Sequence, residues 1–265
     1  MPIVFAAISP HPPILIPGVG KENLEKIKKT QAAMRQLEQE LYAAKPECVL
    51  IISPHGKILP EAFTINLAEK YEIGFEDFGD FATKMVLASD PLCVAKIRAQ
   101  DEINKKAPLT LISEKKIDHG AGIPLYYLMG HLKEVPIIPI VYSTLDYQAH
   151  YDFGKFLYRC ASRIDKRVAI VASGDLSHRL SEEAPGGYCP QGEKFDKKIL
   201  ALIKAGDAKG LMSMDEKFVK EACECGLKSI LILMGFLSEI KIKPEILSYE
   251  GPFGVGYAVV NFKLG

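Results

Sequence analysis

Short apolar runs and longer amphipathic segments alternate along this chain. Runs of branched apolar residues bounded by glycine, proline or polar residues are typical of buried strands. We expect strands at residues 2–8, 48–53, 63–67, 109–112, 137–142, 168–172, 246–249 and 255–262. Apolar residues at helical spacing predict helices at residues 21–44, 91–104, 124–132, 148–164, 191–204, 207–213, 215–221 and 225–237. This alternation indicates an α/β fold in which helices cover a mostly parallel or mixed sheet.

We expect residues 1–265 to form a single domain of three layers, with a central sheet flanked by helices, because no repeat, low-complexity tract or linker interrupts the sequence. Two stretches depart from the alternating pattern. Residues 58–92 include a segment rich in Gly, Phe and acidic residues, and we interpret them as an excursion that shapes a substrate pocket. Residues 184–192 are rich in Pro and Gly, which predicts a lid or flexible cover.

Composition and charge exclude several kinds of partner. The 33 basic and 33 acidic residues balance, and 48% of the residues are apolar, as in an ordinary globular protein. The sequence has no basic stripe interleaved with aromatic residues, so nucleic acid is not an expected partner. The first residues lack the features of a signal peptide, and no apolar stretch is long enough to span a bilayer. We therefore expect no membrane association and a cytoplasmic location.

The cysteines are scattered along the chain without the CxxC spacing of a zinc knuckle or a redox motif. They stand at positions 48, 93, 160, 189, 223 and 225. We expect most of them to be reduced and buried as small hydrophobic residues. Cys223 and Cys225 are the exceptions, because they lie with Glu224 at the start of a helix whose body is apolar.

Three histidines directly follow expected strands. His11 follows the first strand in Ser-Pro-His-Pro-Pro, and His55 follows the second in Ser-Pro-His-Gly. His178 closes the segment Ser-Gly-Asp-Leu-Ser-His, which comes directly after the strand at residues 168–172. Open α/β sheets keep their ligand sites in the loops at the carboxyl ends of the strands. The sequence therefore predicts one shared site that contains all three histidines.

This pattern is suited to binding a metal ion. Neutral imidazole is the commonest ligand of transition metals, and two histidines with one carboxylate leave positions open for substrate and dioxygen. We expect His11 and His55 to be ligands because prolines stiffen their loops, although their spacing is equally compatible with histidines that bond only to the backbone. Glu224 is the expected third ligand, and Glu250 is the competing carboxylate. An acidic residue at a helix start also commonly compensates the helix dipole.

Other polar residues near these loops are candidates for catalysis. Asp175 precedes His178 by three residues, close enough for its carboxylate to orient the ring as a general acid or base. The alternative is that Asp175 only caps the turn. His119, in Asp-His-Gly, has a similar place between a strand and a helix and is a second candidate that does not bind the metal. Lys57 and Arg179 are candidates for contacting an acidic substrate.

Two further histidines lie outside this predicted site. We interpret His131, at a helix end, and His150, in a polar stretch rich in tyrosine, as surface or C-cap residues.

Taken together, these motifs resemble those of the class III extradiol ring-cleaving dioxygenases, the family of the LigB catalytic subunit. They occur in the family's order from residue 9 to about residue 257. The closest similarity is to a LigB-like branch often joined to a second, AMMECR-type domain, and to the related Memo proteins. The segments that carry it are Ser9-Pro10-His11-Pro12-Pro13, Ser53-Pro54-His55-Gly56, Asp118-His119-Gly120 with Ile123-Pro124-Leu125, Ser173 to His178, and the Glu-Cys-Gly helix start.

The resemblance implies a non-haem Fe(II) ion held by His11, His55 and Glu224. It also implies that His178 is the acid or base beside the metal and that His119 helps to bind oxygen or substrate. The implied reaction opens a catechol-type aromatic ring next to its hydroxyl groups and inserts both atoms of dioxygen. Because the family commonly dimerises, a homodimer is also implied.

The sequence departs from the family pattern around the third ligand. Cys225 or Cys223 is an alternative ligand there, as a cysteine is in Memo-like relatives. A thiolate would favour zinc or another divalent metal in place of iron. Two other functions therefore stay open: a catalytically silent, Memo-like module that binds a metal or a peptide, and a zinc hydrolase that uses a metal-bound water.

Overall fold

The computed structural model describes residues 3–104 and 108–265. Its main sheet contains β1 (Ile3–Ser9), β2 (Cys48–Ser53), β3 (Phe63–Asn66), β6 (Leu109–Ile112), β7 (Ile137–Val141), β8 (Val168–Ser173), β9 (Ile242–Glu250) and β10 (Tyr257–Leu264). Within the described residues, these eight strands have the order β6-β3-β7-β2-β8-β1-β10-β9. The expected α/β fold with a mixed sheet between helices is therefore confirmed.

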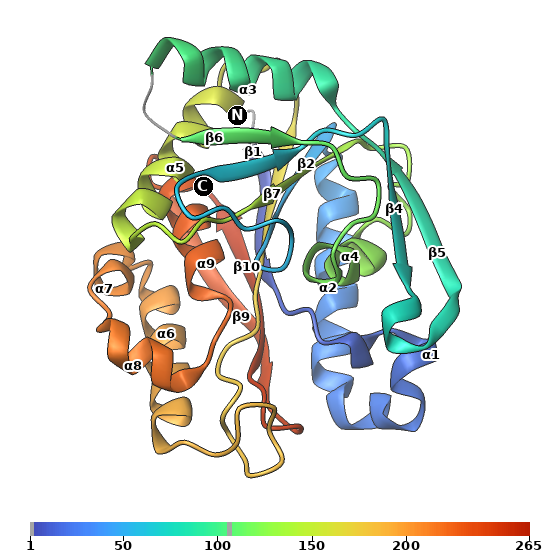
Figure 1. The fold of residues 1–265 in the computed structure, drawn as a ribbon, viewed down its shortest axis with the longest axis vertical. Coiled ribbons are helices and arrows are strands. Elements are labelled where there is room, and N and C mark those ends of the chain that lie inside the picture. The colour runs from blue at the N-terminus through green and yellow to red at the C-terminus, as the bar shows by residue number, and fades with distance from the viewer. Residues whose placement is uncertain (1–2, 105–107) are drawn as a thin grey trace.

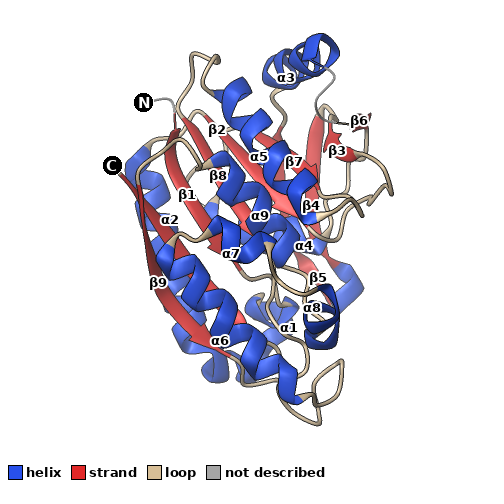
Figure 2. Cartoon of the chain, turned by 90° about the vertical axis from the view of Figure 1, so that its left-hand side faces the viewer, coloured by secondary structure: helices blue, strands red, loops and turns tan. Residues whose placement is uncertain are grey.

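Helices cover both faces of this sheet (Figure 1). One face carries α3 (Pro91–Asn104), α5 (Tyr147–Ala161), α6 (Pro190–Ala205), α7 (Ala208–Met212), α8 (Glu216–Ala222) and α9 (Leu227–Phe236). The other face carries α1 (Pro17–Gly20), α2 (Lys28–Ala44), α4 (His119–Leu128) and a separate antiparallel pair, β4 (Lys70–Phe75) and β5 (Asp80–Ala88). Figure 2 shows α5, α6, α7 and α9 in front of the sheet.

The central strands are buried on both faces. In β2, Leu50 and Ile52 belong to the apolar cluster under α5 and α9, whereas Val49 and Ile51 belong to the cluster under α2 and α4. Every residue of β2 and β8 is buried. Because neither face is exposed to water, these strands read as continuous apolar runs rather than as an alternation of apolar and polar residues.

The register of the central strands brings several loops to one edge of the sheet. The strand β8 is parallel to β2 on one side and to β1 on the other. In this register Ser173 is opposite Ser9, and Ala172 is opposite Ile52. The three strands therefore end at the same level, and the loops that follow them are neighbours.

The excursion at residues 58–92 has more structure than the sequence predicted. Besides β3, it contains the β4–β5 hairpin, whose turn is a short 3-10 helix at Glu76–Phe78 followed by Gly79 at a φ of 85°. Alternate residues of β4 are buried, namely Tyr71, Ile73 and Phe75. The Gly-, Phe- and acid-rich stretch thus forms the end of the hairpin rather than an irregular loop.

Several element boundaries differ from those expected. The helix expected at residues 124–132 begins at His119, because the Asp118 carboxylate accepts a hydrogen bond from the backbone of Ala121 at 3.1 Å and caps the helix start. The helix expected from residue 21 is 3-10 at Lys21–Ile27 and becomes α-helical at Lys28. Residues 184–189 form the loop before α6, and their role as a lid stays a prediction. In the described part of the chain, no helix combines the length and apolar character that crossing a bilayer requires.

Candidate metal centre

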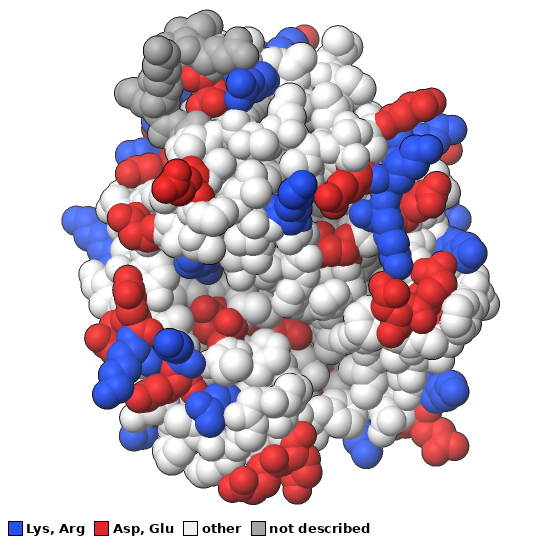
Figure 3. Space-filling model, in the orientation of Figure 1, with Lys and Arg blue, Asp and Glu red and all other residues white. Residues whose placement is uncertain are grey.

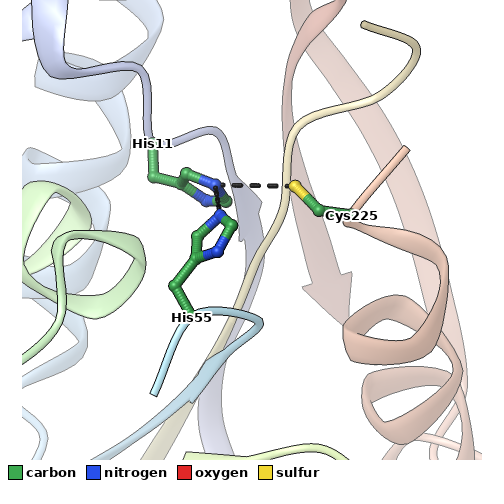
Figure 4. Close-up of side chains that lie close together, drawn as sticks. All are labelled: His11, His55 and Cys225. Carbon is green, nitrogen blue, oxygen red and sulfur yellow. Dashed lines mark hydrogen bonds between the residues drawn. The ribbon is translucent and has the colours of Figure 1, made fainter. Parts of the chain in front are cut away.

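Two histidines meet at the edge where β1, β8 and β2 end. His11 lies just after β1, and His55 lies just after β2. Their rings approach at right angles, and their Nε2 atoms are 3.0 Å apart (Figure 4). The structure therefore brings together the two residues that the sequence predicted as metal ligands.

Cys225 brings a third donor atom to these imidazoles from the other side (Figure 4). Its Sγ lies 3.5 Å from His11 Nε2, and the donor atoms of His11, His55 and Cys225 all lie within 4.8 Å of one another. Cys225 belongs to the turn between α8 and α9, which packs directly on the loop after β8. A Cβ atom at Gly174 would be 2.2 Å from the Cα of Gly226, so this close approach requires glycine. The thiol position is thus fixed by backbone packing.

The side chains of this group are suited to a transition metal ion. Burial, together with the rings of His119 and His178, lowers the pKa of His11 well below its usual value. Partial burial and the neighbouring histidine rings lower the pKa of His55 to about 3. Both imidazoles are therefore neutral at physiological pH, with lone pairs available to a cation. Burial and the nearby Asp175 and Glu224 carboxylates raise the pKa of Cys225 well above its usual value, and the backbone N–H of Asp175, which donates to Sγ at 3.3 Å, offsets this only in part. A metal ion would therefore have to displace the thiol proton of Cys225.

The carboxylates that the sequence offered as third ligand have other contacts. Glu224 Oε2 accepts a hydrogen bond from the backbone of Leu227 at 2.6 Å, so it caps the start of α9. Burial raises the pKa of Glu224 to about 7. Glu250 Oε1 accepts hydrogen bonds from the backbone and the hydroxyl of Thr30, each at 2.7 Å, in the first turn of α2. Neither carboxylate belongs to the group formed by the two histidines and Cys225.

Cys223, the other alternative ligand, is exposed at the end of α8 with a φ of 55°. It lines the same cavity as Glu224 and Cys225 but is outside the group of donor atoms.

A buried hydrogen-bond relay orients the His11 ring. Pro124 lies inside α4 and has no N–H, so the carbonyl of Gly120, four residues earlier, lacks its helical donor. The Ser173 hydroxyl donates to this carbonyl. Its oxygen lies 2.8 Å from His11 Nδ1, and because its proton is used, it accepts from the ring. His11 is therefore held with the proton on Nδ1 and the lone pair of Nε2 facing the other two donors.

The three residues predicted to act in catalysis lie around this group. His178 Nδ1 is 3.0 Å from the carbonyl of Leu176, an arrangement that places the proton on Nδ1 and leaves Nε2 able to accept one. Asp175 is directed to His11 rather than to His178: Oδ1 accepts from the backbone of His11 at 2.8 Å, and Oδ2 lies 3.9 Å from His11 Nε2. Burial raises the pKa of Asp175 to about 6. The His119 ring stacks on His55 with the centroids 4.3 Å apart.

Two cavities flank the candidate metal centre. The first, of about 520 Å³, is lined by residues that include His55, His119 and Phe78 from the hairpin turn. The second, of about 660 Å³, is lined by residues that include Cys225 and Tyr142. Figure 3 shows a hollowed face on which charged side chains of both signs are interspersed. Both volumes are in the range of small-molecule sites.

The basic residues expected near the site have different positions. Lys57 lines the first cavity. Arg179 is partly buried, and its Nη1 donates to the carbonyl of Glu221 at 3.4 Å.

The remaining histidines do not join the centre. His131 is on the surface, as expected, with Nδ1 at 2.7 Å from the carboxylate of Glu38. The interpretation of His150 as a surface or cap residue is wrong, because its side chain is fully buried next to Phe63. His150 shares the buried face of α5 with Phe153 and Gly154, and the helical spacing of these positions was the signal for its burial.

Comparison with known proteins identifies the class to which this fold and site correspond. Residues 5–260 match the family described as the catalytic LigB subunit of aromatic ring-opening dioxygenase. Because this match covers nearly the whole chain, the protein belongs to that family.

Individual relatives extend this result. Protein CA_C1420 of Clostridium acetobutylicum is 35% identical over 96% of this chain and 56% of its own length. The 2,3-dihydroxyphenylpropionate/2,3-dihydroxicinnamic acid 1,2-dioxygenase of Klebsiella pneumoniae strain 342 is 27% identical over 53% of this chain and 46% of its own length. The chain thus spans about half the length of the curated relatives it matches. An uncharacterized Escherichia coli K12 protein, JW3007, has a similar fold, with a TM-score of 0.70, 15% identity and coverage of 97% of this chain and 99% of its own.

Proposed function

We propose that this protein is a metal-dependent dioxygenase that opens a catechol-type aromatic ring with insertion of both atoms of dioxygen. The observation that carries the proposal is the convergence of His11, His55 and Cys225 beside His178, at the carboxyl edge of the sheet. Membership of the ring-opening dioxygenase family supports the reaction class, and relatives named for the cleavage of dihydroxylated aromatic acids support the substrate class.

In this proposal His11, His55 and Cys225 hold the ion, which we propose to be Fe(II), with zinc or another divalent metal as the alternative. The bound ion would supply Lewis acidity towards the catechol hydroxyls and a site for dioxygen. His178 accepts a proton from a substrate hydroxyl at Nε2, because Nδ1 is engaged by the carbonyl of Leu176. His119, stacked on His55 at the wall of the first cavity, orients the ring or the dioxygen.

Oxygen uptake by protein reconstituted anaerobically with Fe(II) tests this function on a panel of substituted catechols, with the ring-opened product followed by absorbance. His178→Ala should lower turnover by at least about a hundredfold, the usual size of a general acid-base contribution, while the iron content stays unchanged. His131→Ala is the matched control, because that ring is exposed and pairs with Glu38. Loss of iron in His178→Ala would instead indicate that His178 is a metal ligand.

A second candidate function is a metal-binding module that does not turn over catechols. It is favoured by one observation, that the third donor near the two histidines is the sulfur of Cys225 rather than a carboxylate oxygen. Thiolate ligands favour softer metals than the usual arrangement of two histidines and one carboxylate. Stoichiometric metal binding that depends on Cys225, with no oxygen uptake across the whole panel, would support this candidate over the dioxygenase.

A further inference from the structure

A second group of potential metal-binding side chains lies at the opposite end of β2. Cys48 is the first residue of this strand, and Cys93 lies in the first turn of α3. The donor atoms of these two thiols and of the Asp90 carboxylate lie within 4.8 Å of one another. Cys48, Asp90 and Cys93 are 1%, 4% and 2% exposed. This group takes no part in the candidate metal centre.

The contacts of Asp90 make this group a poor cation site. Asp90 Oδ1 accepts a hydrogen bond from the backbone of Cys93 at 3.1 Å. Asp90 Oδ2 accepts one from Lys166 Nζ at 2.6 Å. Both carboxylate oxygens are therefore engaged. The positive charge of Lys166 lies beside the group and would repel a metal ion. The thiol pair has to be considered on its own.

The surroundings give the two thiols different roles. The sulfur atoms of Cys48 and Cys93 lie within 4.8 Å of each other, and each thiol shifts the pKa of the other. The neighbouring Cys48 thiol lowers the pKa of Cys93, and Lys166 acts in the same direction, whereas the Cys93 thiol and burial raise the pKa of Cys48. The Asp90 carboxylate acts in the opposite direction and raises the pKa of Cys93, but the net shift of the Cys93 pKa is downward. Cys93 is thus the more easily formed thiolate, and Cys48 is the thiol held against it.

We propose that Cys48 and Cys93 are an oxidation site that forms an intramolecular disulfide with hydrogen peroxide as the oxidant. The Cys93 sulfur attacks one peroxide oxygen and the O–O bond breaks. This gives a sulfenic acid and one water, whose second proton is the former thiol proton of Cys93. The Cys48 sulfur then attacks the Cys93 sulfur, the S–O bond breaks, and a second water leaves with the Cys48 proton. The two thiols lose two electrons, and the peroxide gains them.

The disulfide would restrict the chain segment that forms part of the wall of the first cavity. The chain between Cys48 and Cys93 contains the loop with His55, the strand β3 and the β4–β5 hairpin that carries Phe78. His55 and Phe78 both line that cavity. A covalent link between the ends of this segment restricts its unfolding, and we expect the unfolding temperature to rise by about 5 °C on oxidation.

The test is treatment of the full native chain with hydrogen peroxide, followed by alkylation and peptide mapping without reduction. We expect a Cys48–Cys93 linked peptide in most wild-type chains and its disappearance after a dithiol reductant. The link should form equally in Cys160→Ala, the matched control, since Cys160 is also buried, at 3% exposure. It should be absent from Cys48→Ala and Cys93→Ala. The wild-type measurement does not depend on whether any variant folds.

Three results would overturn the proposal. The first is a pair that stays reduced while the exposed Cys223 is oxidised. The second is a mixture of links that includes Cys160, because it would mean that oxidation occurs only in unfolded chains. The third is a metal ion retained by the Cys48–Cys93 pair in the double variant His11→Ala, His55→Ala, because a bound metal would assign the thiols to coordination.

Discussion

The two ends of β2 each lie beside a group of three potential metal-binding side chains, and the groups differ in what surrounds them. At the carboxyl end, His11, His55 and Cys225 come from three loops and border two cavities. At the amino end, Cys48, Asp90 and Cys93 are buried, and Lys166 holds the carboxylate. Although the donor atoms lie at similar separations, we therefore propose cation binding at the carboxyl end and thiol chemistry at the amino end. The factor that separates them is the charge of the nearest neighbour, which at the amino end is the ammonium group of Lys166.

Among the substitutions proposed here, removal of a histidine ligand should change metal binding most. In His11→Ala, we expect metal affinity at the carboxyl-end group to fall beyond detection after dialysis, because the buried Nε2 contacts both other donors. The metal content of each chain, measured by elemental analysis, checks this. His131→Ala should keep the full metal content. Metal retained by His11→Ala would instead indicate that the amino-end group is the metal site.

The identity of the third ligand gives the next largest effect. Loss of a residue that only hydrogen-bonds to a metal ligand typically lowers metal affinity tenfold to hundredfold. Because Cys225 is proposed to be a ligand itself, Cys225→Ala should lower metal affinity by at least this much. Glu224→Gln should change it by less than about threefold, because this carboxylate caps α9. Competition with a chromophoric chelator measures both affinities. The opposite ranking of the two variants would restore Glu224 as the ligand.

Loss of the relay to His11 should have a smaller effect. In Ser173→Ala, we expect metal affinity to fall about tenfold, because His11 loses the partner that keeps its proton on Nδ1. Ser229→Ala is a suitable control, since Ser229 is equally buried and its hydroxyl has no hydrogen-bond partner in the described structure. Nitrogen NMR of the histidines should also show a changed tautomer of His11 in Ser173→Ala only. Equal affinities in the two variants would rule the relay out.

The smallest effect is expected at the amino end. In Lys166→Met, the free energy of unfolding should fall by about 1 kcal/mol, because Asp90 stays buried without its ion pair while Lys166 itself is partly exposed. Lys197→Met, which breaks the exposed pair with Glu193, should cost close to nothing. Urea denaturation of the two variants measures this. Uptake of a second metal ion by Lys166→Met would show that the ammonium group is what excludes cations there.

Much of the fold could be predicted because the parallel strands are buried on both faces. The runs at Val49 to Ile52 and Val168 to Ala172 read as strands from their own composition, and their loops carried the histidines to the expected edge. The β4–β5 hairpin was missed because β5 has an irregular burial pattern along its length. The early start of α4 depends on the single cap by Asp118, which the apolar spacing does not reveal.

The site could be predicted only in part, for a physical reason. His11 and His55 are placed by strands, so the sequence located them. The choice between Glu224 and Cys225 depends on which way neighbouring side chains point in one turn, and the turn is fixed by the approach of Gly174 to Gly226. The role of Ser173, at the end of β8, depends on the carbonyl of Gly120 that Pro124 leaves free in α4. Contacts of this kind between distant segments have no local signature in the sequence.

The position of β8 between β1 and β2 has a consequence for the biosynthesis of this protein. His11 and His55 are made early, but the strand that separates and aligns their strands is made much later, and Cys225 later still. A nascent chain that contains only the first two strands cannot hold both imidazoles at the native separation. Insertion of a central strand between distant segments is also a slow, non-local step. The metal ion is therefore expected to enter a completed fold rather than to guide its formation.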